Sequence, residues 1–140
     1  MRGDAPISEY EVRDLVAGFF HAVHIGGSAA ALAPMFAPGV AIETWFGPPR
    51  TLEAYLDVHA RLVREQHTLL DTTLVPMADG RMRVLGEIEW EAVIAATGAI
   101  VQAVVSADWI VERAEDGRAR FARCAATAIR YLPGSATLEV

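Results

Sequence analysis

Lysine is absent from this chain of 140 residues, and all 12 basic residues are arginine. A chain without lysine cannot form a Schiff base through a side chain, so that class of covalent catalysis is excluded. Cysteine is almost as scarce, because the single Cys124 cannot form an internal disulfide and nothing indicates an oxidising compartment. The uncharged segment of residues 92–107 is shorter than the roughly 20 residues of a membrane-spanning helix, and Thr97-Gly98 within it predicts a turn.

Positive charge is also in short supply. The 18 acidic residues outnumber the 12 basic ones, and the formal net charge is −6. An acidic chain without a basic cluster is a poor ligand for nucleic acid or an anionic membrane, so neither partner is expected. Charged residues in the first 25 positions argue against a signal peptide, and we expect a cytoplasmic protein. Residues 1–140 are expected to form one domain, with residues 1–7 and 133–140 as flexible ends.

Hydrophobic spacing in the first half of the chain predicts three helices. Ser8 and Glu11 match a capping box ahead of apolar residues at helical spacing, and Gly26-Gly27 ends that helix. Ser28 is the expected cap of a short second helix through residue 36. Thr51 is the expected cap of a third helix, whose apolar stripe runs to residue 63. Between the second and third helices, residues 40–46 are predicted to form a strand.

The second half of the chain predicts four strands separated by turns. Apolar and charged residues alternate strictly in parts of this region, as in a sheet with one buried face. Helices followed by a long antiparallel sheet predict an α+β fold, a curved antiparallel sheet wrapped around three helices. Such a cone encloses a hydrophobic interior that can hold a small apolar molecule. The expected strands are residues 67–75, 81–95, 99–114 and 118–132.

Three segments resemble the nuclear-transport-factor-2-like superfamily. They are Met35-Phe36-Ala37-Pro38-Gly39-Val40, Glu43-Thr44-Trp45-Phe46-Gly47-Pro48-Pro49 and Asp116-Gly117-Arg118. Over residues 8–132 the chain is most similar to the SnoaL-like polyketide cyclase and ketosteroid isomerase branch. The resemblance implies a curved sheet of four to six strands around three helices, a homodimer formed through the outer sheet face, and activity without a cofactor. Because this fold hosts many functions, the resemblance indicates the fold more strongly than the activity.

The ketosteroid isomerase positions are mostly replaced. The position of that enzyme's catalytic aspartate is Thr44 here, and a threonine hydroxyl cannot accept a proton at neutral pH. The position of its oxyanion-hole tyrosine is Phe20, which has no donor group. Its second oxyanion acid matches Asp108 only after a shift of one residue. Steroid isomerisation by that mechanism is therefore not expected.

The dehydratase branch of the family fits better at one position. The segment His67-Thr68-Leu69-Leu70-Asp71 resembles the family's His-x-x-x-Asn, which implies that His67 is a general base for removing a proton next to a carbonyl. The family's partner aspartate falls at Ile25, and the adjacent His24 takes its place after a one-residue shift. The SnoaL-like cyclases place an acid/base aspartate on a central strand, for which Asp108 is the nearest match.

Structural roles compete with these assignments. A single histidine that begins a strand is commonly a hydrogen-bonded structural residue, and this alternative stays open for His67. Strand alternation places Asp108 opposite Trp109, on the outer or dimer-facing surface, unless a bulge intervenes. His21 and His24 have a spacing that zinc accepts, but no further ligand motif accompanies them, so no metal site is expected.

Two functional hypotheses follow. In the first, the protein binds a small apolar cyclic or carbonyl compound and catalyses cofactor-free dehydration, isomerisation or cyclisation, with His67 as general base and Asp108 or His24 assisting. In the second, it is a non-catalytic ligand-binding or dimerisation module of the same fold. Both expect a cavity lined by aromatic and small polar residues, namely Phe20, Thr44, Trp45, Tyr55, His59 and Trp90.

Overall fold

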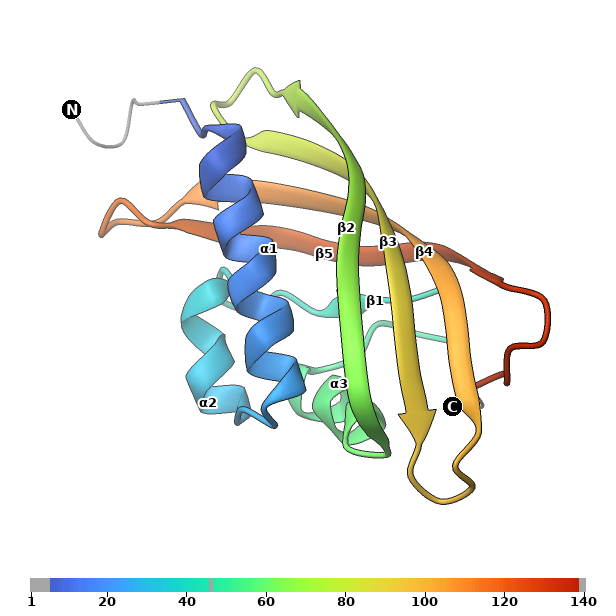
Figure 1. Cartoon of the computed structure of the whole chain (residues 1–140). Helices are drawn as coiled ribbons and strands as arrows, with labels where there is room; N and C mark the ends of the chain where they lie inside the picture. The colour runs from blue at the N-terminus through green and yellow to red at the C-terminus, as the bar shows by residue number, and fades with distance from the viewer. Residues whose placement is uncertain (1–5, 46, 139–140) are drawn as a thin grey trace.

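Four long strands form most of a curved sheet in the computed structural model, which describes residues 6–45 and 47–138. The helices precede these strands in the sequence and lie together on one side of the sheet (Figure 1). In chain order the elements are α1 (Glu9–His24), α2 (Ala29–Leu32), the 3-10 turn η2 (Ala33–Met35), β1 (Ile42–Glu43), α3 (Leu52–His59), β2 (Leu62–Pro76), β3 (Met82–Ile94), β4 (Ile100–Arg113) and β5 (Ala119–Tyr131).

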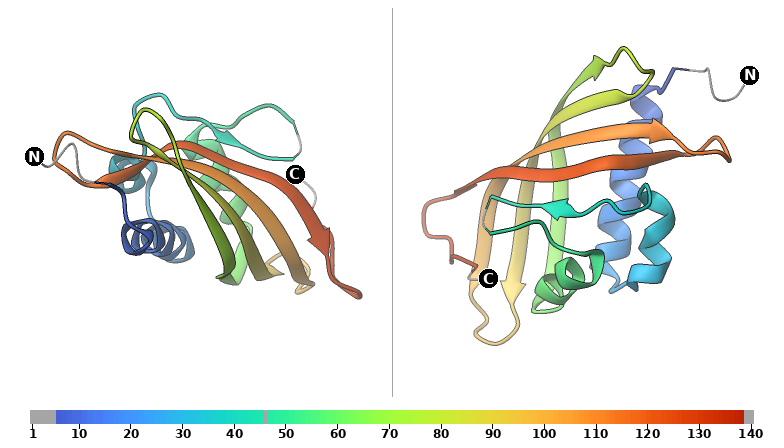
Figure 2. Two further views of the ribbon diagram at one scale, coloured as in Figure 1. Left: turned by 90° about the horizontal axis from the view of Figure 1, so that it is seen from above. Right: turned by 180° about the vertical axis from the view of Figure 1, so that it is seen from behind.

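The sheet has the order β1-β5-β4-β3-β2. The four long strands are antiparallel, whereas the short β1 pairs parallel with β5 at its edge. The sheet is therefore mixed, although the sequence predicted it to be antiparallel. Two further views show the long strands bending along their length, as expected for a sheet that curls over helices (Figure 2). The predicted α+β cone is confirmed.

The caps expected from the sequence start all three helices. Ser8 and Glu11 form a complete capping box, and the Ser28 and Thr51 side chains accept backbone hydrogen bonds from Ala31 and Ala54. These contacts satisfy amide groups that the first helical turn leaves without partners. The chain leaves α1 through Gly26, whose φ of +72° suits a residue without Cβ.

The core lies between the helices and the inner face of the sheet. Along β3, buried and exposed residues alternate over most of the strand, so its charged residues face outward as predicted. From α1, Phe19 packs against Phe36 and Phe121, with ring centroids 5.5 and 5.6 Å apart. The helices fill only part of the cone, and a cavity remains between α1, α3 and the sheet.

The largest local difference from the sequence prediction lies after α3. This helix ends at His59, and β2 begins at Leu62, five residues before the predicted strand start at His67. Leu62 and Val63 therefore belong to the sheet and not to a helical stripe. The predicted strand at residues 40–46 is also reduced to Ile42–Glu43, because only these residues pair with β5; Phe46 lies outside the described residues.

Parts of both chain ends are packed against the domain. Ile7 is buried in the core, and the Pro6 carbonyl accepts a hydrogen bond from Arg113. After β5, the Ala136 amide donates to the carbonyl of Ile100, and residue 138 reaches the interior. Residues 6–7 and 133–138 therefore differ from the loose ends that the sequence suggested, because backbone and apolar contacts fix them.

Candidate functional site

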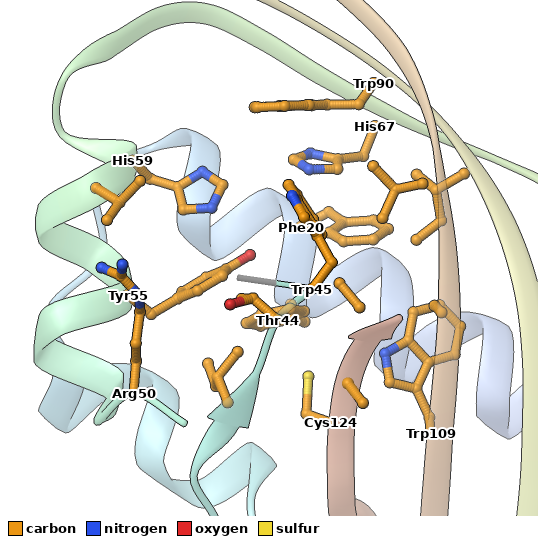
Figure 3. Close-up of a pocket in the computed structure, with 18 of the residues that line it drawn as sticks. Phe20, Thr44, Trp45, Arg50, Tyr55, His59, His67, Trp90, Trp109 and Cys124 are labelled. Carbon is orange, nitrogen blue, oxygen red and sulfur yellow. The ribbon is translucent and has the colours of Figure 1, made fainter. Parts of the chain in front are cut away.

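A mainly apolar cavity of about 100 Å³ lies between α1, α3 and the inner face of the sheet. His59 and Tyr55 project into it from α3, while His67 and Trp90 face them from β2 and β3 (Figure 3). The six residues predicted to contact a ligand all line this cavity: Phe20, Thr44, Trp45, Tyr55, His59 and Trp90. Their shared location is consistent with a binding site for an apolar molecule.

His67 occupies the cavity wall in a defined orientation. Its ring stacks on Phe20 with centroids 4.2 Å apart and an interplanar angle of 10°. Its Nδ1 lies 2.7 Å from Nε2 of His24, at the end of α1, so a hydrogen bond joins the two rings. Two of the three catalytic candidates predicted from the sequence, His67 and His24, are therefore in direct contact. His24 also borders an outer hollow between α1 and α3, and so connects the cavity wall with solvent.

Glu65 is the central polar residue of the site, and it is not among the residues predicted from the sequence. Its side chain is only 5% exposed, and its Oε2 lies 2.5 Å from Nδ1 of His59 and 2.9 Å from Nε1 of Trp90. The same oxygen lies 3.9 Å from Nε2 of His67. One carboxylate therefore links α3, β2 and β3 from behind the rings that line the cavity, where Glu65 borders the outer hollow.

A β-bulge turns Glu65 toward the rings of His59, His67 and Trp90. Pairing with β3 shifts by one residue between Val63 and Gln66, and Arg64 within the bulge has a φ of +52°. The extra residue allows Leu62, Glu65 and His67 all to face inward, which regular alternation forbids. A left-handed conformation at a residue with a Cβ costs about 1–2 kcal/mol, so the surrounding pairing must hold it in place.

One feature of the sequence indicates that Glu65 could lie beside His67. Glu65 and His67 are two residues apart, the spacing of neighbours on one face of a strand. The predicted strand begins at His67 and leaves Glu65 outside it. The prediction therefore does not place the two residues on the same face of one strand. A predicted strand that began before Glu65 would have placed Glu65 and His67 together in one strand.

Burial and neighbouring charge set the protonation of this cluster. Burial by itself raises the pKa of Glu65, but the hydrogen bonds from His59 and Trp90 and the favourable electrostatic interaction with the His59 and His67 rings outweigh this effect and lower the pKa below its usual value. Burial, together with the nearby His59 and His24, lowers the pKa of His67 to about 3, although Glu65 opposes this change. At neutral pH, Glu65 is thus an anion and His67 an uncharged ring.

Two further groups inside the cavity stay protonated. Burial raises the pKa of Tyr55 well above its usual value, and the tyrosine hydroxyl projects into the cavity in Figure 3, where it can donate a hydrogen bond. Burial also raises the pKa of Cys124 to about 12, so its thiol is not a ready nucleophile. The cavity therefore offers the Tyr55 hydroxyl as a hydrogen-bond donor, together with histidines backed by a carboxylate, among mainly apolar walls.

Asp108 lies outside this site. It faces the outer side of the sheet, where its carboxylate bonds to Arg83 at 2.7 Å and to Arg123 at 3.1 Å. Hydrogen bonding to Arg83 lowers its pKa, although partial burial opposes that change. No bulge reverses its direction: Asp108 pairs with Leu85 while its neighbour Trp109 lines the cavity. The structure therefore does not bring Asp108 together with His67. Asp108 lies on the outer face of the sheet, as strand alternation predicts.

The other sequence expectations concern a metal and a membrane. Within residues 6–45 and 47–138, no group of three His, Cys, Asp or Glu side chains is arranged to hold a metal ion. No helix in the same part of the chain is both long and apolar enough to cross a membrane.

Solved structures resemble this fold closely despite low sequence identity. A candidate aromatic ring hydroxylase from Novosphingobium aromaticivorans has a TM-score of 0.72 at 16% identity, covering 88% of this chain and 92% of its own. A candidate scytalone dehydratase from the same organism has a TM-score of 0.73 at 10% identity, covering 88% and 83%. An NTF2-like protein from Cytophaga hutchinsonii has a TM-score of 0.67 at 13% identity, covering 87% and 99%.

These likenesses confirm the predicted nuclear-transport-factor-2-like fold. No protein-family model and no curated protein sequence matches the chain. At such identities a structural likeness establishes the fold and leaves the activity to be argued from the site itself.

Proposed function

We propose that the protein binds a small, largely apolar cyclic carbonyl compound and catalyses its dehydration, isomerisation or cyclisation by proton transfer. The histidines that line the cavity and Glu65 behind them supply the acid–base groups, and no cofactor is required. The observation that supports this proposal most directly is the convergence of titratable groups on one apolar cavity: His59 and His67 both line it, and Glu65 contacts both.

The reaction class follows from what such a cavity can do. Apolar walls exclude water, which strengthens the effect of the few charges and donors that remain. A proton next to a carbonyl can then be removed by a histidine while a donor such as Tyr55 stabilises the oxygen. The structural likeness to a candidate scytalone dehydratase supports the dehydration alternative without identifying a substrate.

A ketone probe tests the proposal without knowledge of the natural substrate. In D₂O, an enzyme that removes α-protons should accelerate deuterium exchange into 2-tetralone or the smaller cyclohexanone, measured by proton NMR. We expect acceleration by the unaltered protein and a loss of about 100-fold or more in His67→Ala. Binding of the ketone, measured by calorimetry, should change little. If neither exchange nor binding changes in His67→Ala, the role of His67 is structural.

A binding module is the second candidate, and particular residues favour it. Phe20, Ile25 and Thr44 stand where the resemblance expects tyrosine and two aspartates. The low pKa of His67, about 3, also makes this ring a weak base in the unliganded protein. A protein that binds 2-tetralone tightly but leaves its deuterium exchange at the rate in buffer is a binding module.

We also propose a homodimer formed through the outer face of the sheet. Leu70 and Leu85 are 51% and 39% exposed there, on β2 and β3. Burial of such side chains against a second copy is favourable. Light scattering should give twice the mass of 15.1 kDa, and a monomeric mass at micromolar concentration contradicts the proposal. A cytoplasmic location is likewise a proposal.

A further inference from the structure

The two histidines that line the cavity have different hydrogen-bond partners, and this difference determines where each carries its proton. His59 contacts an anion, because its Nδ1 lies 2.5 Å from the ionised carboxylate of Glu65. An ionised carboxylate only accepts hydrogen bonds, so Nδ1 of His59 must carry the proton between them. When the ring is uncharged, Nε2 of His59 is then its unprotonated nitrogen, and this ring lines the cavity.

Trp90 fixes the same carboxylate from the other side. Its Nε1, which can only donate, lies 2.9 Å from the Oε2 that His59 contacts. The oxygen is thus fully engaged by two donors from α3 and β3. This arrangement resembles the carboxylate–histidine pairs of hydrolases in principle, since the acid sets the tautomer and stabilises the imidazolium that forms.

His67 has the opposite arrangement. Its Nδ1 faces Nε2 of His24 at 2.7 Å, and its own Nε2 lies 3.9 Å from the Glu65 carboxylate. A proton on Nε2 points positive charge toward that anion, whereas a lone pair there is repelled by it. The favoured tautomer of His67 therefore accepts from His24 and carries its proton on Nε2. At 3.9 Å this N–H is not consumed by a hydrogen bond to Glu65 and remains available to a ligand.

We propose that His59, positioned by Glu65, is the proton acceptor of the cavity, and that His67 acts as an uncharged hydrogen-bond donor to the carbonyl oxygen of the bound compound. This inference rests on the proposed function and reassigns the base role that the sequence suggested for His67. His24 then acts as a positioning residue, because its donated hydrogen bond holds the His67 tautomer.

The chemical step balances without any further reactant. The α-carbon–hydrogen bond breaks, the proton forms a new N–H bond at Nε2 of His59, and the electron pair moves onto the carbonyl oxygen. That oxygen gains the hydrogen bond from His67 as its charge grows, and Glu65 stabilises the imidazolium. In an isomerisation the proton returns to another carbon; in a dehydration the electron pair expels a β-hydroxyl group, which leaves as water with that proton. An uncharged imidazole serving as donor to a developing enolate is an established catalytic principle.

Nitrogen-detected NMR of the unaltered protein tests the tautomers directly and needs no substrate. At pH 7 we expect His59 protonated on Nδ1 with bare Nε2, and His67 protonated on Nε2 with bare Nδ1. The reverse tautomer at His67, with a bare Nε2 facing the cavity, overturns the inference and restores His67 as the base. That outcome leaves the proposed function intact, so the two can fail separately.

Variants test the roles through 2-tetralone exchange. We expect His59→Ala to lose about 100-fold or more, with partial recovery when free imidazole is added to replace the missing ring. Glu65→Gln should lose roughly 10- to 100-fold and change the His59 tautomer, whereas Glu89→Gln on the exposed face of β3 should match the unaltered protein. Unchanged exchange in folded His59→Ala, with loss in His67→Ala, contradicts the assignment. No exchange by the unaltered protein contradicts the proposed function itself.

Discussion

Nε2 of His24 and Nδ1 of His67 lie 2.7 Å apart, although 43 positions separate the two residues in the sequence. The contact joins the last turn of α1 to the inner face of β2. The resemblance to dehydratases implies a carboxylate at the end of this helix, and here a second imidazole fills that place. Among the residues that the structure describes, His67 thus has no charged partner within hydrogen-bonding distance, because Glu65 stands 3.9 Å away and is already bound by His59.

Supplying a carboxylate at position 24 should change the protonation of His67. In His24→Glu, the new negative charge near Nδ1 favours the imidazolium, so the pKa of His67 should rise from about 3 toward its usual value. Proton NMR titration of the ring measures this change. His21→Glu, with the same charge one turn earlier on the exposed face of α1, is the matched control and should have a smaller effect. An unchanged His67 titration in His24→Glu contradicts the contact.

The buried, uncharged His67 should make stability depend on pH. Its pKa is about 3 in the folded protein and 6.5 in an unfolded chain, so the unfolded state binds more protons between these values. The stability present above pH 6.5 should therefore be lost as the pH falls toward 3, at up to about 1.4 kcal/mol per pH unit. Urea unfolding at several pH values measures the slope. His67→Gln should flatten it just below pH 6.5, where most carboxylates are still ionised.

Removing the Trp90 donor should destabilise the fold through Glu65. Trp90→Phe keeps an aromatic ring but leaves the buried carboxylate with one donor fewer. The expected loss is about 1–3 kcal/mol in the free energy of unfolding, beyond the smaller ring's lost packing. Chemical denaturation measures it. Tyr10→Phe, at a side chain 78% exposed, should be neutral, and a Trp90→Phe protein as stable as this control is the contrary result.

The bulge residue should tolerate glycine better than a β-branched residue. Arg64→Val must hold a branched Cβ at a φ of +52°, and should lower stability by about 1–2 kcal/mol. Arg64→Gly removes that strain and should be neutral or stabilising. The control Glu89→Val, on the exposed face of β3, should not destabilise. Equal stabilities for Arg64→Val and Arg64→Gly contradict the strained conformation.

Asp108 should matter for stability and not for the cavity. Asp108→Asn weakens bonds to Arg83 and Arg123 on the outer face, with an expected loss of about 1–3 kcal/mol. Ketone binding and α-proton exchange should stay at the level of the unaltered protein. A folded Asp108→Asn protein that binds normally but loses exchange indicates a catalytic contribution that its position does not explain.

The helices were predictable because their signals are local. Ser8, Ser28 and Thr51 each cap the helix that the sequence assigned to them, and the cavity residues follow from apolar spacing combined with the family resemblance. Glu65 was not predictable in the same way, because its direction depends on a bulge fixed by pairing with β3. Asp108, in contrast, was predictable, because regular strand alternation places its side chain on the outer face of the sheet, where the structure has it.

All 3 tryptophans of the chain, Trp45, Trp90 and Trp109, line the same cavity. The protein's tryptophan emission therefore arises entirely from the walls of this cavity, with no contribution from an indole elsewhere. A ligand that displaces water from these rings, or a proton that moves onto a neighbouring imidazole, changes the colour and intensity of that emission. The chain thus contains an optical reporter of its own occupancy, which permits screening of unlabelled compounds without an assay for the reaction.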